Sequence, residues 1–303
     1  MGKERAMKAI CRLTSKRIPT RVRKPAYDAN SVVASHTIFG ALFNCAVKAE
    51  LSRLIESLRR GDLLVSSLFP GKGKSFFVPK PLLVPHGLGL DKLKKFKKLK
   101  FVEINELSEW KPDGIKISLE KVPEGYKPLD VEGIRVTMDR LTNSTEPFVD
   151  ESYTFFKEDF AYFFIDFPDE LEEDVKSLLG LLVCEGIGGD RTVGYGIFEE
   201  FELIPVRFEN SDYYVSLSQF IPGDGERDKL VSWEIVEHGG TYIYKEGGTT
   251  LIKPLYRLCK EGSVLSEKAR GEVRTYSVPG HKEEFLFYAK AYLLPIGGKV
   301  WIG

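Results

Sequence analysis

Residues 186–196, GIGGDRTVGYG, place five glycines in eleven positions beside one arginine and one tyrosine. Glycine lets the backbone adopt conformations that other residues avoid, and it lets a ligand approach the main chain closely. Exposed backbone amides together with Arg191 suit a phosphate, and the ring of Tyr195 suits stacking on an extruded base. The segment therefore predicts a phosphate or nucleotide site, with a turn-rich loop that binds nothing as the alternative.

The elements on either side of this loop limit the kind of phosphate site. Upstream, a helix is predicted because leucine and valine recur at helical spacing from Leu171 to Leu182, after Pro168. Downstream, residues 197–206 predict a strand that ends near Pro205. A P-loop or dinucleotide fingerprint needs strand, loop and helix in that order, and here the order is reversed. Tyr195 and Gly196 also stand where a Walker motif requires Lys and Ser or Thr.

Length and composition indicate a globular protein with room for two domains. The chain has 303 residues, of which 43% are apolar and 29% charged, and 12% aromatic residues suggest much β-sheet. No apolar run reaches the eighteen or so residues that a membrane helix needs. The first residues lack the apolar core of a signal peptide, so we expect a cytoplasmic protein.

Cysteine and histidine show no pattern typical of a metal site. The four cysteines are far apart without a Cys-x-x-Cys pair, which predicts buried, reduced thiols. The four histidines have no ligand spacing either. We expect no metal and no cofactor. These residues are Cys11, Cys45, Cys184, Cys259, His36, His86, His238 and His281.

A zero net charge hides two halves of opposite charge. Residues 1–100 hold 22 Lys and Arg against 6 Asp and Glu, whereas residues 101–303 hold 22 against 38. A half this basic favours a polyanion. Several cations lie on or just after a predicted first strand at residues 7–14, which alternates as a half-buried strand does. They repel one another unless an anion joins them, so they are candidate RNA contacts, with a solvated loop as the alternative. They are Arg12, Lys16, Arg17, Arg21, Arg23 and Lys24.

The next segments predict a helix, two strands and a basic insertion. Ser35 or Thr37 is expected to cap a helix that ends at Gly61. Residues 63–69 and 76–84 then predict two strands, the second ending irregularly at its prolines. In residues 91–100, six lysines surround Leu93, Phe96 and Leu99 on one helical face, which predicts a packed insertion helix with diffuse, salt-sensitive attraction for RNA.

Residues 134–167 form an aromatic and β-branched stretch. Its second half predicts a hairpin that turns at residues 157–159. Its first half, which contains Arg135, Asp139 and Arg140, predicts an extended arm. Arginine forks phosphates and stacks on bases, so this arm suits nucleic acid, with a solvated β-edge as the alternative.

These elements give the order β-α-β-β-(insertions)-α-β, which is the ferredoxin-like or RRM arrangement. No RNP1 pattern is present. Residues 206–303 have strand patterns and few helix signals, and predict a second, mostly β domain. The fold class is therefore α+β, with tandem ferredoxin-like (RRM-like) domains at 1–205 and 206–303. The first domain includes a basic insertion (about 86–133), a hairpin arm (about 134–167) and the glycine-rich loop (186–196).

The helix, glycine-rich loop with an arginine, and strand resemble those of the RAMP proteins, RNA-binding relatives of the RRM fold found in CRISPR systems. Further segments resemble one RAMP group, the 5′-handle-binding subunit of the type III-A CRISPR (Csm) effector complex. They occur in the right order over most of the chain. His36, which we count among the candidate RNA contacts, departs from the pattern. The segments are SHTIFGAL, VSSLFP, FFVPKPLL, IRVTMDRLTNSTEPFVDESYTFF, CKEGSVL and AKAYLLPIG.

This resemblance implies a non-catalytic, RNA-binding subunit that holds the 5′ handle of the CRISPR RNA and contacts both the large polymerase-like subunit and the repeated backbone subunit. It implies that the arm acts as a thumb-like hairpin near the junction of handle and guide. The residues that match the family's glycine-rich loop are Gly186, Gly188, Gly189, Arg191, Gly194, Tyr195 and Gly196, and those that match the arm motif are Asp139 and Arg140.

Two alternatives remain open. One is a RAMP-type metal-independent endoribonuclease that processes CRISPR transcripts with His36 as general base; it lacks an obvious acid and cation partner in the sequence. The other is a protein-interaction scaffold whose glycine-rich loop is structural. Salt distinguishes the scaffold, because phosphate binding weakens as ionic strength rises.

Overall fold

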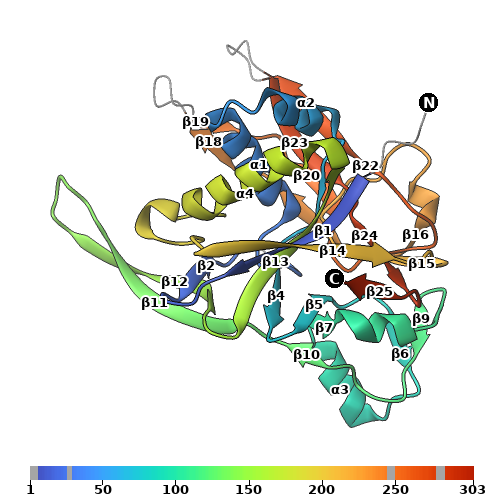
Figure 1. Ribbon diagram of the computed structural model, residues 1–303. Coiled ribbons are helices and arrows are strands. Elements are labelled where there is room, and N and C mark those ends of the chain that lie inside the picture. The colour runs from blue at the N-terminus through green and yellow to red at the C-terminus, as the bar shows by residue number, and fades with distance from the viewer. Residues whose placement is uncertain (1–5, 26–28, 244–249, 278–283) are drawn as a thin grey trace.

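The computed structural model describes residues 6–25, 29–243, 250–277 and 284–303. It is a mixed α/β structure, mostly of strands with few helices (Figure 1). Its centre is a nine-stranded antiparallel sheet with the order β10-β7-β5-β4-β13-β1-β14-β25, in which β3 also pairs with β13. The strands of this sheet are β1 (Ala6–Thr14), β3 (Leu64–Val65), β4 (Phe69–Lys72), β5 (Ser75–Pro79), β7 (Phe101–Glu103), β10 (Gly125–Tyr126), β13 (Asp159–Pro168), β14 (Glu200–Phe208) and β25 (Val300–Ile302).

The middle of this sheet is covered on both faces. Cys11 and Leu13 of β1 belong to one apolar core with α1 and α4, whereas Ile10 belongs to a second core on the other face. The prediction of a half-buried first strand is therefore wrong for its centre. Strand β13 behaves in the same way, with Phe163 in the first core and Phe164 in the second. A short continuous apolar run is what a strand buried on both faces requires.

The predicted helix from Ser35 to Gly61 is two helices, α1 (Ser35–Lys48) and α2 (Ser52–Arg60). The chain breaks between them, where Glu50 takes a positive φ of 54°. Neither Ser35 nor Thr37 caps α1, because the cap residue is Ala34 and makes no side-chain cap bond. The predicted end at Gly61 is confirmed, with a left-handed φ of 73°. The helix before the glycine-rich loop, α4 (Glu172–Glu185), is also confirmed.

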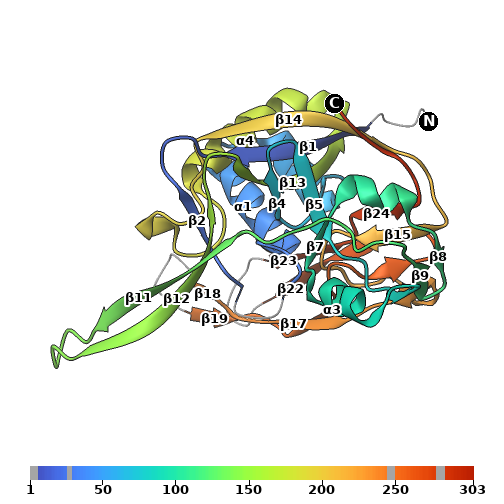
Figure 2. The same cartoon turned by 90° about the horizontal axis from the view of Figure 1, so that it is seen from below.

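The arm is a hairpin of β11 (Leu129–Met138) and β12 (Thr145–Phe155), which turns at residues 139–144 and projects from the body (Figures 1 and 2). The hairpin predicted to turn at residues 157–159 is wrong. Strand β12 pairs with β11 and with β2 (Thr20–Arg23), whereas β13 belongs to the central sheet. Residues 157–159 are thus the point where the chain leaves the arm for the core.

The insertion packs at the β10 end of the sheet. Helix α3 (Leu90–Lys98) is confirmed, and Phe96 of its apolar stripe is buried against Trp110, with ring centroids 6.3 Å apart. The predicted strands around it are shorter than expected. The strand predicted at residues 63–69 is broken between β3 and β4. Of the strand predicted at residues 76–84, β5 covers the part up to Pro79, and Val84 begins the separate strand β6 (Val84–His86). Strand β6 forms a small sheet with β8 (Pro112–Asp113) and β9 (Lys116–Ser118), and η1 spans Ile104–Glu109.

The C-terminal part is mostly β, as predicted, and its described residues after 209 include no α-helix. Tyr288 donates a hydrogen bond to the carbonyl of Val65 and stacks on Phe39, so this part shares a core with the first half. Tyr244, at the end of one predicted strand, lies outside the described residues. The strands are β15 (Tyr213–Ser216), β16 (Leu230–Ser232), β17 (Ile235–His238), β18 (Thr241–Ile243), β19 (Thr250–Ile252), β20 (Tyr256–Cys259), β21 (Val264–Leu265), β22 (Gly271–Ser277), β23 (Glu284–Lys290) and β24 (Leu293–Ile296).

The end of β14 and the burial of the cysteines differ from the prediction. The strand expected to end near Pro205 continues to Phe208, because β14 gains β25 as a second neighbour from Val206 onward. All four cysteines are free thiols, and three are buried, but Cys184 is exposed. No helix within the described ranges has the length and apolarity that a membrane crossing demands.

Candidate nucleic-acid interface

The glycine-rich loop closes on itself between the end of α4 and the start of β14. The amide of Ile187 donates to the carbonyl of Gly196 at 2.9 Å. A Cβ atom at Gly196, where φ is 69°, would overlap the carbonyl of Ile187. A Cβ atom at Gly186, where φ is 80°, would lie 3.2 Å from the carbonyl oxygen of Gly196. These two glycines are therefore required by closure of the loop itself.

The other three glycines of the loop are uncrowded. Gly188 and Gly194 have φ values of 89° and 92°, which favour glycine, but a Cβ atom there would meet nothing nearer than 3.9 Å. A Cβ atom at Gly189 would lie 3.7 Å from the side chain of Arg23. The main chain at these positions is thus open to a ligand, whereas the main chain at Gly186 and Gly196 is not.

The loop is tied to strand β2 and to the arm by a network of charges. Asp190, between the glycines, accepts hydrogen bonds from Arg23 at 2.9 Å and from Arg135 of β11 at 3.1 Å. The guanidinium of Arg135 also lies 3.9 Å from the carboxylate of Asp150 on β12. Both arginines predicted to contact RNA are therefore already paired with carboxylates.

Tyr195 faces into the molecule rather than toward solvent. Its side chain is buried, and its hydroxyl donates a hydrogen bond to the buried carboxylate of Asp150. This hydrogen bond, together with burial, raises the pKa of the tyrosine. The ring is not available to stack on a base in this arrangement, contrary to the role expected for it.

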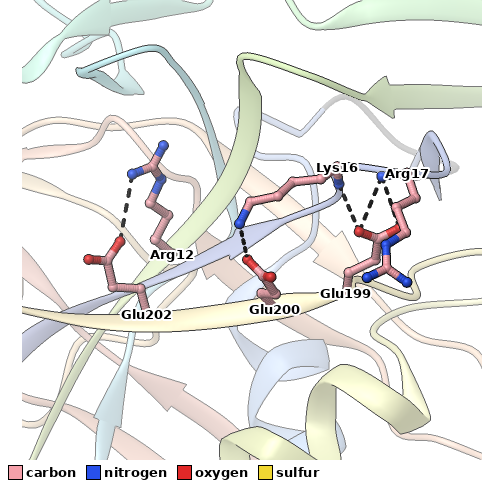
Figure 3. Close-up of polar contacts among 6 residues, drawn as sticks. All are labelled: Arg12, Lys16, Arg17, Glu199, Glu200 and Glu202. Atoms are coloured by element: carbon pink, nitrogen blue, oxygen red, sulfur yellow. Dashed lines mark hydrogen bonds and ion pairs between the residues drawn. The ribbon is translucent and has the colours of Figure 1, made fainter.

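Acids at and just before the start of β14 contact the basic connector (Figure 3). Glu199 accepts hydrogen bonds from the backbone amides of Lys16, at 2.9 Å, and of Arg17, at 3.1 Å, and these hydrogen bonds lower its pKa. The ammonium group of Lys16 lies 2.6 Å from a carboxylate oxygen of Glu200. The premise that these cations lack acids is therefore wrong, because the acids lie about 180 residues away in the chain.

Arg12 and Lys24 are paired as well. Arg12 lies 3.6 Å from Glu202 and 4.2 Å from the centre of the Phe160 ring. Lys24 lies 2.6 Å from Asp130 and 3.1 Å from Glu151. Burial lowers the pKa of Lys24, but hydrogen bonds to the two carboxylates outweigh it, so the pKa is raised overall.

Four predicted contacts remain exposed and form no ion pair with another described residue: Arg17, Arg21, Arg140 and Arg191. Arg21 is next to the loop, since its carbonyl accepts a hydrogen bond from the amide of Gly196 at 2.6 Å. Arg191 is in the loop, in the short 3-10 helix Arg191–Val193. Arg140 is at the distant tip of the arm. Arg191 thus lies in the loop and Arg21 on the strand bonded to it, whereas Arg140 is distant from both.

Asp139 is a structural residue of the arm tip. Its carboxylate accepts the amide of Leu141 at 2.8 Å, and this hydrogen bond is the first cause of its lowered pKa. The carboxylate therefore fixes the turn between β11 and β12, as aspartate commonly does in turns.

His36 lies away from the loop, in the first turn of α1, where it faces the C-terminal strands β17 and β23. Its ring centroid is 3.9 Å from that of His238 and 5.6 Å from that of Phe287. Burial, reinforced by His238 and Lys253, holds the pKa of His36 well below its ordinary value. No local pattern predicts this neighbour, since the two histidines are 202 positions apart. No group of three or more histidine, cysteine or acidic side chains within the described ranges is arranged to hold a metal, and His281 lies outside them.

Sequence reasoning missed the acids of this surface. The sequence contains a local signal for Asp190, because a single carboxylate next to an arginine in a glycine-rich loop is a candidate for an ion pair. Asp150 and Glu199 had none, since their partners are far away in the chain.

The comparisons with known proteins agree with the resemblance read from the sequence. The family described as CRISPR Csm4 C-terminal domain matches residues 209–296. A Csm4 protein of Thermococcus onnurineus is 27% identical over 266 residues, which cover 82% of this chain and 87% of that protein. The chain resembles Csm4 over most of its length. A Csm4 protein of Methanocaldococcus jannaschii is 29% identical over 131 residues, 38% of this chain and 35% of that protein.

Solved structures share the fold. A chain of the Csm3-Csm4 subcomplex of a type III-A CRISPR-Cas interference complex matches with a TM-score of 0.63 and 19% identity, covering 95% of this chain and 99% of that chain. A chain of a Csm1-Csm4 cassette bound to pppApA matches with a TM-score of 0.61 and 20% identity, covering 95% and 98%. The expected resemblance to this CRISPR subunit is confirmed.

Proposed function

We propose that this chain is the Csm4-type subunit of a type III-A CRISPR effector complex, where it bridges the large polymerase-like subunit and the repeated backbone subunit and holds the 5′ handle of the CRISPR RNA. The observation that carries this proposal is the alignment with a Csm4 protein over 82% of the chain. The bridging role is supported by solved structures in which similar chains occur in a Csm3-Csm4 subcomplex and in a Csm1-Csm4 cassette. The subunit acts in the cytoplasm and grips RNA without cutting it.

The order of elements supports a ferredoxin-like first domain at residues 1–205. Strands β4, β13, β1 and β14 are adjacent and antiparallel in that order, with α1 after β1 and α4 before β14. This is the β-α-β-β-α-β arrangement with insertions between its parts. Residues 206–303 form the second domain, a degenerate copy in which strands replace the helices.

The open side of the glycine-rich loop is the proposed handle site. Arg191 and Arg21 are exposed beside it, and the main chain at Gly188, Gly189 and Gly194 admits a phosphate. Arg12, Lys16, Arg17, Arg23, Lys24 and Arg135 form the basic rim of this site. Those already paired with carboxylates must exchange that partner for a phosphate, so they contribute less than the two exposed arginines. Arg140 and Asp139 belong to the arm tip and contact the RNA at a separate point.

Binding of CRISPR RNA with and without its 5′ handle tests this function. The purified chain, alone and with its large-subunit partner, is titrated with both RNAs across a salt series. We expect a preference for the handle that weakens several-fold in Arg191→Ala, but not in Arg59→Ala, which removes an exposed arginine of α2. Equal affinity for both RNAs in the assembled complex would contradict the proposal.

A further inference from the structure

A cavity of about 380 Å³ lies where the base of the arm meets the edge of the central sheet. Four lysines line it, Lys24, Lys98, Lys100 and Lys127, against one carboxylate, Asp130. Its volume is within the range of sites that hold small molecules. Lys24 pairs with Asp130 and with Glu151 beside the cavity, and Lys127 pairs with Asp130. Four lysines against these two carboxylates still leave a net positive charge, which is complementary to an anionic ligand.

The remaining walls of this cavity are apolar and fixed in place. Leu99, Pro128 and the ring of Tyr126 line it. Tyr126 is held by a hydrogen bond from its hydroxyl to Asp159, at 2.6 Å, and by stacking on Phe77, with centroids 5.0 Å apart. A rigid apolar wall opposite lysines suits a ligand that has both a phosphate and a flat or sugar-like part.

Strand β2 connects this cavity with the glycine-rich loop. Arg23 forms an ion pair with Asp190 of the loop, and the next residue, Lys24, lines the cavity with its ammonium 5.4 Å from the centre of the Tyr153 ring. Two consecutive residues therefore reach the loop and the cavity, with their side chains on opposite sides of the extended chain. Helix α3 has further lysines that do not line the cavity, at Lys92, Lys94, Lys95 and Lys97.

We propose that this cavity is a second RNA site, which binds a phosphate and its nucleoside from single-stranded RNA that leaves the glycine-rich loop along β2. The inference rests on the proposed function and adds the path of the RNA to it. A linear polyanion spans the loop, β2 and the cavity at once, whereas a free phosphate fills only the cavity. The lysines hold the backbone, and Leu99, Pro128 and Tyr126 receive the sugar or base. Such sites give affinity with little sequence preference.

The test compares two pairs of exposed lysines in the full chain. Lys98→Ala with Lys127→Ala removes two cavity cations, and Lys95→Ala with Lys97→Ala removes two cations outside it. Binding of a fluorescent 12-nucleotide single-stranded RNA is measured by anisotropy at several salt concentrations. We expect about tenfold weaker binding for the cavity pair and a salt slope smaller by about 0.7, the contribution of one single-strand phosphate. The control pair should lose less than threefold.

The same preparations separate the possible outcomes. Unchanged unfolding midpoints would show that both pairs fold normally. Cross-linking of RNA that contains 4-thiouridine should label the peptide with Tyr126 and Lys127. Equal losses for both pairs, or displacement of the RNA by millimolar inorganic phosphate, would overturn the cavity site. Unchanged affinity for both RNAs in the cavity pair, with handle preference that falls in Arg191→Ala, would overturn this inference and leave the proposed function intact.

Discussion

The hydroxyl of Tyr195 donates a hydrogen bond to the buried carboxylate of Asp150, which joins the glycine-rich loop to the second strand of the arm. Arg135 strengthens this junction, since its guanidinium lies 3.9 Å from Asp150 and 3.1 Å from Asp190. The loop and the base of the arm are therefore held as one unit. An RNA that displaces Asp190 from its arginines also changes the contact that orients the arm.

Tyr195→Phe removes the hydroxyl and leaves the buried carboxylate of Asp150 without the hydrogen bond that the hydroxyl donates. Its other oxygen has no hydrogen-bond partner among the described residues, and Arg135, 3.9 Å away, is too distant to replace the lost hydrogen bond. We expect the free energy of unfolding to fall by about 1–3 kcal/mol, the usual cost of an unsatisfied buried polar group. Urea denaturation measures this change. Hydrogen exchange should also become faster across residues 129–155.

Tyr213→Phe is the matched control for this variant. The hydroxyl of Tyr213 accepts the amide of Gly114 at 3.1 Å, far from the arm. This control should lose some stability without faster exchange in residues 129–155. Faster exchange of the arm in both variants would mean that the Tyr195 hydroxyl does not hold the arm in place.

The glycines of the loop should differ in their response to alanine. Gly196→Ala places a Cβ atom against the carbonyl of Ile187 at a positive φ, so we expect the unfolding midpoint to fall by several degrees or the protein not to fold. Gly189→Ala meets its first neighbour at 3.7 Å and should leave the midpoint within about one degree. Differential scanning calorimetry of the two variants distinguishes them. Equal midpoints would show that closure of the loop does not depend on Gly196.

The sequence was sufficient to place most elements of the first half, because apolar periodicity and glycine stops are local signals. Strand β1, helix α4 and the end of α2 at Gly61 are where those signals put them. The break at Glu50 was not predictable in this way, since the apolar spacing continues across it. Which strands pair was also not predictable from the sequence. For this reason a hairpin was expected to turn at residues 157–159, whereas the hairpin of the arm turns at residues 139–144.

The charges of the site were the least predictable part. Arg12, Lys16 and Arg23 read as unpaired cations because their acids, Glu202, Glu200 and Asp190, are more than 160 residues away in the chain. The arm shows the same difficulty. It was expected to attract nucleic acid through its arginines, yet residues 129–155 hold six acidic residues and two arginines. Only the folded structure shows which of the cations form no ion pair with an acidic side chain.

The pair His36 and His238 makes the stability of the fold dependent on pH. Burial lowers the pKa of His238 to about 4 and that of His36 well below its ordinary value, and Lys253 adds to both effects. The unfolded chain takes up protons on both rings near pH 6.5, whereas the folded chain does not. Stability is therefore full above about pH 6.5 and falls as the pH is lowered toward 4.

His36→Gln should reduce this dependence, because glutamine does not titrate. In the unmodified protein we expect the free energy of unfolding to fall by roughly 1 kcal/mol between pH 7 and pH 5, a modest value because solvent screens the partly exposed ring of His238. The variant should lose about half as much over the same range. Urea unfolding at pH 7, 6 and 5 measures the difference, with His86→Gln, on the exposed strand β6, as the control. A pH dependence that is unchanged in His36→Gln would mean that this histidine pair is not its source.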